Sequence, residues 1–388
     1  MHVPANRSEL LGRARQMRDR IASRAEEAED LRRLPDATIS DFMEAGFFSV
    51  LVPERFGGLE MSLDVLVDLA IEIGQVCGSS AWVLALLGIH NWLAALFPEE
   101  TQEELFSENA FVLAPATFAP GGHLRPCPGG FRLEGRWSFG TGCYHGQWVF
   151  VSGLVDGGGE GAPEVLCAAV PMDQVRIEDN WHTSGMRGTG SADLVIEETF
   201  VPESRTIGFS GLVAGRSPGS RVHPSPLFQL PLVPVLAQVA TGPAVGLAKG
   251  ALAAFQDRAR QRSWGAGADS AATQIRLAEA SMEVTAAEQL LHESVDSLLR
   301  RNARGEKFSV EDRAYFRMTA CYATTLCTRS IDRVVSAAGA RAQFRDSPLQ
   351  RQQRDIQTLR GHVVFDFDAT AELFGRTLFG LEPNHALL

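Results

Sequence analysis

The sequence predicts a mainly α protein with a small β domain in the middle of the chain. Apolar side chains recur at helical spacing in residues 7–45 and again from Leu227 onward. Between about Phe111 and Gly208, short apolar runs alternate with glycine and proline, which is typical of strands joined by turns. We therefore expect a helical domain, a β domain, a linker and a helical bundle, with bounds at 1–110, 111–208, 209–226 and 227–388.

The N-terminal domain is expected to consist of helices joined by short turns. The helical pattern of residues 7–45 ends at Gly46, and residues 47–53 indicate a short extended segment. Ser79 and Ser80 supply hydroxyl groups of the kind that cap a helix. Further helices are expected at residues 63–75, 81–97 and from Pro98 onward.

The middle of the chain and its C-terminal half follow different periodicities. Residues 209–226 are rich in glycine, serine and proline, which favours a linker or surface loop. Long helical patterns follow at residues 276–299 and 312–338, and alanine and glycine are concentrated in residues 240–255. Strands are expected at residues 111–116, 130–139, 147–155, 164–171 and 193–202.

Composition and charge argue against several classes of protein. A formal net charge of −11 makes nonspecific binding to nucleic acid a poor fit. The six cysteines form no Cys-x-x-Cys pair, and no spacing of His, Cys and carboxylates indicates a metal site. The apolar run 81–97 is short for a membrane span and favours a buried core helix. Residues 1–16 lack an apolar signal core, so we expect a reduced, cytoplasmic protein.

Four segments of distinctive composition lie at residues 46–58, 135–142, 181–191 and 347–362. Residues 181–191 read WHTSGMRGTGS, a loop whose glycines and hydroxyls leave backbone N–H groups accessible. Together the four segments resemble a flavoenzyme of the acyl-CoA dehydrogenase fold, and the resemblance covers nearly the whole chain. It implies an N-terminal helical domain, a small β barrel or sandwich, and a C-terminal four-helix bundle.

The fourth segment separates two activities found on that fold. The pair Arg354-Asp355 is followed by His362, with no carboxylate between Asp355 and that histidine. Dehydrogenases of the fold often carry a basic Glu in this window, so the pattern resembles the monooxygenases that use reduced flavin. The resemblance implies the oxygenase component of a two-component system, which forms a hydroperoxide at flavin C4a with O2. Such a protein hydroxylates a small aromatic or polyketide substrate.

The reduced flavin is expected to come from another protein. The chain has no P-loop, and GTGSAD lacks the strand-before and helix-after context of a dinucleotide fingerprint. NAD(P)H binding is therefore not indicated. A separate NAD(P)H:flavin reductase is the expected partner, and FMN or FAD in reduced form is the expected co-substrate.

The resemblance also assigns roles to particular residues. His362 takes the position of the dehydrogenase base and, with Thr141, is expected to act on the peroxide. The strand that holds Thr141 runs along the flavin ring in this fold, where it bonds to flavin N5 and O4. Arginines are expected at a flavin phosphate, Arg354 from a neighbouring subunit. The residues expected at the cofactor are Trp137, Phe139, Gly140, Thr141, Thr183, Ser184, Gly185, Arg260, Arg262 and Arg354.

Two histidines and two aromatic residues are candidates for the substrate pocket, namely His90, Trp92, His145 and Phe228. Each also has an ordinary structural explanation. A single histidine in an apolar helix is more often a hydrogen-bonded core residue, and large aromatic side chains commonly fill a core.

Other functions stay open at this point. An acyl-CoA dehydrogenase or oxidase would need a displaced carboxylate base, for which Glu372 and Glu382 are the nearest later candidates. An N-oxygenase of an amino substrate is another alternative, as is a scaffold protein without flavin. Small-residue faces at Gly242, Gly246 and Gly250 suit close packing between subunits, and with the resemblance they predict a homotetramer.

Overall fold

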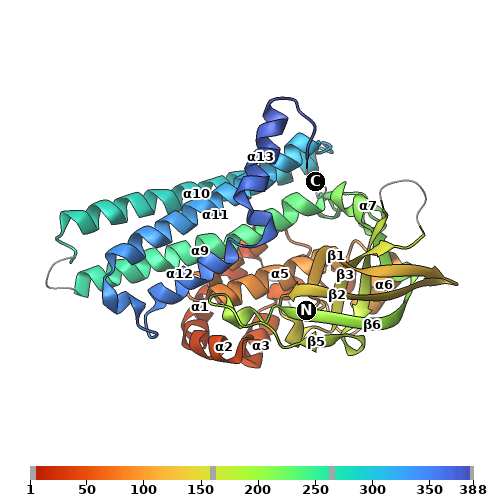
Figure 1. The fold of residues 1–388 in the computed structure, drawn as a ribbon, viewed down its shortest axis with the longest axis horizontal. Coiled ribbons are helices and arrows are strands. Elements are labelled where there is room, and N and C mark those ends of the chain that lie inside the picture. The colour runs from red at the N-terminus through yellow and green to blue at the C-terminus, as the bar shows by residue number, and fades with distance from the viewer. Residues whose placement is uncertain (1–5, 158–162, 262–266, 385–388) are drawn as a thin grey trace.

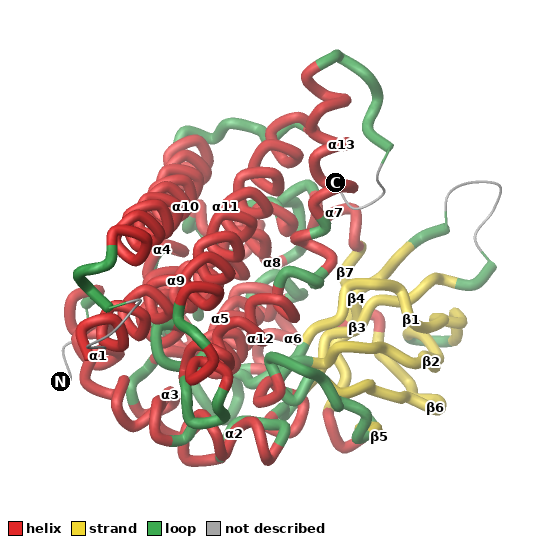
Figure 2. The backbone as a smooth tube through the Cα atoms, turned by 60° about the vertical axis from the view of Figure 1, so that its left-hand side comes forward, coloured by secondary structure: helices red, strands yellow, loops and turns green. Residues whose placement is uncertain are grey.

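The computed structural model describes residues 6–157, 163–261 and 267–384. Helices from both ends of the chain pack side by side, and the β domain lies against one end of them (Figures 1 and 2). This is the order that the sequence predicts, mainly α with a central sheet.

The N-terminal helices are α1 (Arg7–Ser23), α2 (Ala25–Leu31), α3 (Asp36–Glu44), α4 (Leu63–Gly74), α5 (Gly78–Ala94) and α6 (Glu99–Leu105). Two local expectations are wrong here. Residues 47–53 begin with a 3-10 turn, because Phe47 and Phe48 are both fully buried and a strand would point them to opposite sides. Helix α5 begins before Ser79 and Ser80, so neither serine caps it.

One seven-stranded sheet forms the middle of the chain, in the order β5-β6-β2-β1-β3-β4-β7. Strands β1 and β3 run parallel, and the other neighbours run antiparallel. The strands are β1 (Ala116–Cys127), β2 (Gly130–Gly140), β3 (Trp148–Val155), β4 (Val165–Pro171), β5 (Arg176–Glu178), β6 (Ala192–Pro202) and β7 (Thr206–Gly208).

The expected strand at residues 111–116 is wrong except for its last residue. The side chain of Asn91 both donates to the carbonyl of Val112 and accepts from its amide, at 3.1 and 2.7 Å. His90 contacts the carbonyl of Ala114. The backbone of this segment is therefore hydrogen-bonded by side chains of helix α5, which takes the place of a neighbouring strand.

The C-terminal half is a helical bundle with a projecting end. Its helices are α7 (Phe209–Val213), α8 (Gly219–Val222), α9 (Leu232–Gln261), α10 (Ala271–Ala303), α11 (Val310–Ala337), α12 (Pro348–Leu359) and α13 (Phe367–Leu378). In Figure 1, α13 extends beyond the bundle. Helix α9 is long and apolar enough to cross a membrane, but 83% of its most apolar window is buried inside the protein.

The segment 209–226 is not a simple linker, because it contains α7 and α8. Its contact with the core explains why. A side chain at Gly219 would lie 1.9 Å from the carbonyl oxygen of Ala95, so only glycine lets α8 approach the end of α5 so closely. The amide of Gly219 also donates to the carbonyl of Leu96.

The glycine face of helix α9 packs within the chain, and the subunit contact expected from it is wrong. Gly242 lies against Val67 and Ala70, and Gly246 lies against Gly74, all on helix α4. A Cβ at Gly246 would lie 2.7 Å from Gly74, closer than real Cβ contacts allow, and a Cβ at Gly242 would lie 3.0 Å from Ala70, tighter than most. The small residues therefore join the two helical domains of one protomer.

Candidate active site

A cavity of about 120 Å³ lies where helix α5, strand β1, helices α9 and α11, and residues 362–364 meet. Two of the expected site residues, His90 and His362, line it together although they lie far apart in the sequence. Its remaining wall is apolar except for Arg317, and the described residues that line it include no carboxylate. They are Leu86, His90, Ala116, Phe118, Phe209, Leu232, Val233, Leu236, Ala240, Arg317, His362, Val363 and Val364.

His90 is buried, and its hydrogen bond determines which ring nitrogen carries the proton. Nδ1 lies 2.7 Å from the carbonyl oxygen of Ala114, and because a carbonyl only accepts, Nδ1–H must donate. Burial lowers the pKa of His90 to about 4, so the ring is neutral near pH 7. Its Nε2 is then a hydrogen-bond acceptor.

His362 has the opposite arrangement. Its Nδ1 accepts from the backbone amide of Val364 at 3.3 Å, so the neutral ring carries its proton on Nε2. His362 is exposed as a whole residue, while its ring lies 5.3 Å from that of Trp82 in an edge-to-face contact at the cavity wall. Desolvation and the nearby Arg317 both lower the pKa of His362. Near neutral pH, His362 therefore offers a donor and His90 an acceptor.

Thr141 belongs to a chain of hydrogen bonds with a fixed direction. At one end the indole N–H of Trp82 donates to Thr141 Oγ1 at 3.3 Å, and at the other Thr189 donates to the carbonyl of Met186 at 2.9 Å. Ser191 lies between them, 2.9 Å from Thr141 and 2.7 Å from Thr189. The hydroxyl proton of Thr189 is already donated to the Met186 carbonyl, so Thr189 can only accept from Ser191. The proton of Ser191 is then used as well, so Thr141 must donate to Ser191. The lone pairs left on Thr141 can only accept.

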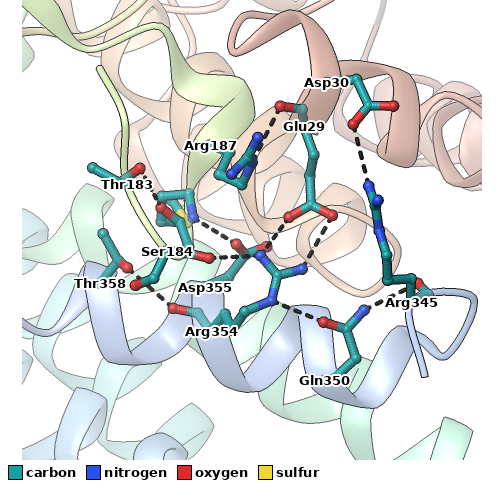
Figure 3. Close-up of polar contacts among 12 residues, drawn as sticks. Glu29, Asp30, Thr183, Ser184, Arg187, Arg345, Gln350, Arg354, Asp355 and Thr358 are labelled. Atoms are coloured by element: carbon teal, nitrogen blue, oxygen red, sulfur yellow. Dashed lines mark hydrogen bonds and ion pairs between the residues drawn. The ribbon is translucent and has the colours of Figure 1, made fainter. Parts of the chain in front are cut away.

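The glycine-rich loop 181–191 is held on helix α12, as Figure 3 shows. Asp355 is buried, and its carboxylate accepts from the amide of Met186 at 2.6 Å. Burial raises the pKa of Asp355 to about 6. Arg354 Nη1 donates to the carbonyl of Ser184 at 2.6 Å and contacts the Glu29 carboxylate at 2.7 Å. The Arg-Asp pair thus joins α2, the loop and α12.

The chain matches two family models, described as the N-terminal and C-terminal domains of acyl-CoA dehydrogenase, over residues 8–107 and 238–367. It is 33% identical to the FADH2-dependent resorcinol hydroxylase, oxygenase component, of Rhizobium sp. (strain MTP-10005), over 97% of this chain and 95% of that protein. The chain belongs to the flavin-dependent monooxygenases of the acyl-CoA dehydrogenase fold.

Solved structures of this monooxygenase family superimpose over the whole chain. The 3-HSA hydroxylase of Rhodococcus sp. RHA1 has a TM-score of 0.93 at 31% identity, over 98% of this chain and 99% of that one. XiaF from Streptomyces sp., solved with FADH2 and glycerol, has a TM-score of 0.90 at 28% identity, over 98% of both chains. The chain is therefore an oxygenase component, which uses a small-molecule substrate and a separate reductase.

The residues around Thr141 fit the flavin ring that this monooxygenase family uses. Phe139 is 65% exposed at a φ of 69°, a strained backbone angle for a bulky side chain and a common sign of a functional position. Its ring contacts Trp181 edge to face. Thr183 donates to the carbonyl of Gly185 and stays half-buried at the same loop. The aromatic side chains of Phe139 and Trp181 would pack against the isoalloxazine, and Thr141 would accept a hydrogen bond from it.

Several expected site residues lie elsewhere. Trp137 is buried in the β core and donates to the carbonyl of Ser152, so it does not reach a flavin. Trp92 and Phe228 are fully buried in the main core and line no part of the cavity. His145 contacts the carbonyl of Leu34, away from the cavity. In each case long-range packing determines the direction of the side chain.

The arginines expected at the flavin phosphate give a mixed result. Arg260 is exposed and pairs with Asp257 on the same helix, which leaves its expected role open. Arg262 lies outside the described residues. Arg354 bonds to Glu29, Ser184 and Gln350 within its own chain, and its expected contact with a neighbouring subunit's flavin stays a prediction. Gly140 is packed against Leu194, and there a side chain would not fit.

Two site residues were missed from the sequence. Trp82 connects Thr141 to His362, and Arg317 is a buried cation at the cavity. Trp82 and Arg317 lie on long helices, where their spacing matches that of ordinary core and surface positions.

Proposed function

We propose that this oxygenase component hydroxylates a small phenolic ring held in the cavity between His90 and His362. The observation that carries the proposal is the pair of neutral imidazoles with opposite hydrogen-bonding roles in one largely apolar cavity. Reduced FMN or FAD, when bound, supplies the electrons that activate O2.

The protein's own residues would prepare the substrate. His90 Nε2 accepts from the phenolic O–H and so increases the electron density of the ring. His362 Nε2–H donates to an oxygen atom on its side of the cavity, where a proton must be held or delivered. The apolar wall, with Phe118 and Leu236 among its members, excludes water that would otherwise divert the reaction.

The dehydrogenase alternative has little support in this geometry. Removal of an α-proton needs a carboxylate at the substrate, and none lines the cavity among the described residues. Glu372 instead accepts from Asn384, and Glu382 lies on the exposed stretch after α13. An amine substrate would also meet His90 as an acceptor, so N-oxygenation is the second candidate function.

The proposed assembly is a homotetramer. Its support is the exposed apolar end of the chain around α13, where Leu378, Phe379 and Leu381 are each more than half exposed. Exposed apolar groups of this size commonly mark a surface that another chain covers.

The test is a reconstituted reaction with ¹⁸O2, NADH, a flavin reductase and a panel of monohydric and dihydric phenols. We expect one labelled oxygen in the product and no NADH consumption when the reductase is left out. If anilines are converted to labelled hydroxylamines while the phenols stay unchanged, the result would favour N-oxygenation. Release of H2O2 alone with every phenol would contradict the proposed function.

A further inference from the structure

Arg317 is a buried cation without an ionic partner. It lies on helix α11, is 3% exposed, and lines the same cavity as His90 and His362. Its Nη2 donates to the carbonyl of Val363 at 2.9 Å, while the buried Nε has no partner. Among the described residues, no hydrogen bond engages Nη1 and no carboxylate forms an ion pair with this guanidinium.

Nearby acidic groups are occupied elsewhere. The carboxylate of Asp366 accepts from the amide of Ala369, and the thiol of Cys321 donates to the carbonyl of Phe365. Burial lowers the pKa of Arg317. Cys321 and Asp366 act in the opposite direction, but only through long-range electrostatic attraction. A guanidinium has five donors and keeps its charge, so leaving it buried and unpaired is costly unless an anion arrives.

Building on the proposed function, we propose that Arg317 anchors an anionic oxygen substituent of the aromatic substrate, with a carboxylate as the simplest case. The planar fork of arginine matches a carboxylate, and an apolar surrounding strengthens that pairing. The cavity would then take a small aromatic acid whose ring lies among apolar side chains. Thr141, which the family resemblance places at the flavin, does not line this cavity.

Helix α11 itself offers a matched control. Arg313, one turn earlier, likewise donates to a backbone carbonyl, that of Phe308 at 2.9 Å, and its Nε is also buried without a partner. Arg313 does not line the cavity. Loss of a half-buried arginine from the same helix can therefore be separated from loss of the proposed anchor.

The experiment compares 3-hydroxybenzoate with 3-hydroxybenzamide, a neutral ligand of similar shape. Their dissociation constants are measured by calorimetry, without flavin and with reduced FMN under argon. We expect the wild-type protein to bind the acid at least about tenfold more tightly, in line with a charge-assisted pair. Arg317→Met should abolish this preference, and Arg313→Met should keep it.

Each outcome decides the proposal. Equal affinity for both ligands in the wild-type protein, or a preference that survives in Arg317→Met, would overturn it. A preference that exists without flavin and vanishes with reduced FMN would mean that Arg317 pairs with an anionic group of the flavin. That result would also overturn the proposal. If Arg317→Met does not fold, Arg317→Gln, which can still donate to Val363, takes its place. Because these are binding measurements, they stand even if hydroxylation fails.

Discussion

At the scale of single residues, the site is defined by the direction of its hydrogen bonds. Two backbone groups decide the tautomers of His90 and His362, and one backbone carbonyl decides the direction of the chain that ends at Thr141. A fixed donor or acceptor costs no rearrangement when a ligand arrives, which is the main advantage of a preorganised site. Three predictions follow from these directions.

Ser191→Ala is expected to weaken the discrimination between reduced and oxidised flavin. Reduced flavin carries a proton on N5 and oxidised flavin does not, so an acceptor-only Thr141 favours the reduced form. Without Ser191, the Thr141 hydroxyl is free to donate. The ratio of the two flavin dissociation constants, measured by fluorescence and anaerobic titration, should fall about five- to tenfold, the net worth of one hydrogen bond. Thr117→Val, which removes a buried hydroxyl without a partner, should leave the ratio unchanged.

His362→Ala is expected to lower the hydroxylation rate by about 10²–10⁴-fold, the usual worth of a positioned proton donor or acceptor. The yield of hydrogen peroxide should rise in proportion, so that less product is formed per NADH consumed. His362→Gln should recover part of the yield if donation from Nε2 is the role. The residue is exposed as a whole, so the melting temperature should change little. A lower melting temperature with normal yield would assign His362 a packing role only.

His90 is expected to make the protein less stable in acid. Its folded-state pKa is about 4 and the ordinary value is 6.5, so the unfolded chain binds more protons between these values. The stabilisation is complete above pH 6.5 and is lost as the pH falls through about 4, by roughly 3 kcal/mol in total. Asp355, with its raised pKa, acts in the opposite direction. Urea unfolding at pH 7, 5.5 and 4.5 should therefore show a shallower pH dependence for His90→Gln than for the wild-type protein.

At the scale of elements, the site depends on how closely the loop 181–191 lies on helix α12. Gly185 has no room for a side chain, because a Cβ there would lie 1.9 Å from the carbonyl oxygen of Arg354. The contact is backbone against backbone, so neither partner can move aside without displacing its element.

Gly185→Ala is therefore expected to push the loop away from the helix. The free energy of unfolding should fall by about 1–3 kcal/mol, as for other overpacked sites, and flavin affinity should fall with it. Gly208→Ala is the control, because a Cβ at Gly208 meets no atom within 4 Å. Equal unfolding midpoints for the two variants in guanidinium would contradict this account.

At the scale of the whole molecule, the two most exposed large apolar side chains of the described residues lie near the end of the chain. Phe379 is 85% exposed and Leu378 is 71% exposed, both at the end of α13, which extends from the bundle in Figure 1. In solution such a surface favours association with further copies of the chain.

Light scattering is expected to give about four times the protomer mass of 42.1 kDa. The variant Leu378→Ser with Phe379→Ser should shift the distribution toward smaller species. Phe200→Ser, which removes an exposed aromatic side chain from the β domain, should not. An active monomer of the wild-type protein at micromolar concentration would contradict the homotetramer.

The sequence by itself determined the order of helices, sheet and helices, the family, and the position of His362. These depend on local patterns, because apolar periodicity and motif spacing are properties of short stretches of chain. The predicted bounds of an element were wrong where a side chain distant in the sequence replaced the expected neighbouring strand. Asn91 does this for the backbone of Val112.

Only the tertiary structure decided which side chains meet. It brought His90 to His362, turned Trp92 and Phe228 into the core, and paired Arg354 with Glu29 of the same chain. It also placed Arg317, one of many arginines in the sequence, beside the cavity without a counter-ion. The direction of a side chain and the identity of its partner depend on packing between segments that are distant in the sequence, and local periodicity carries no information about either.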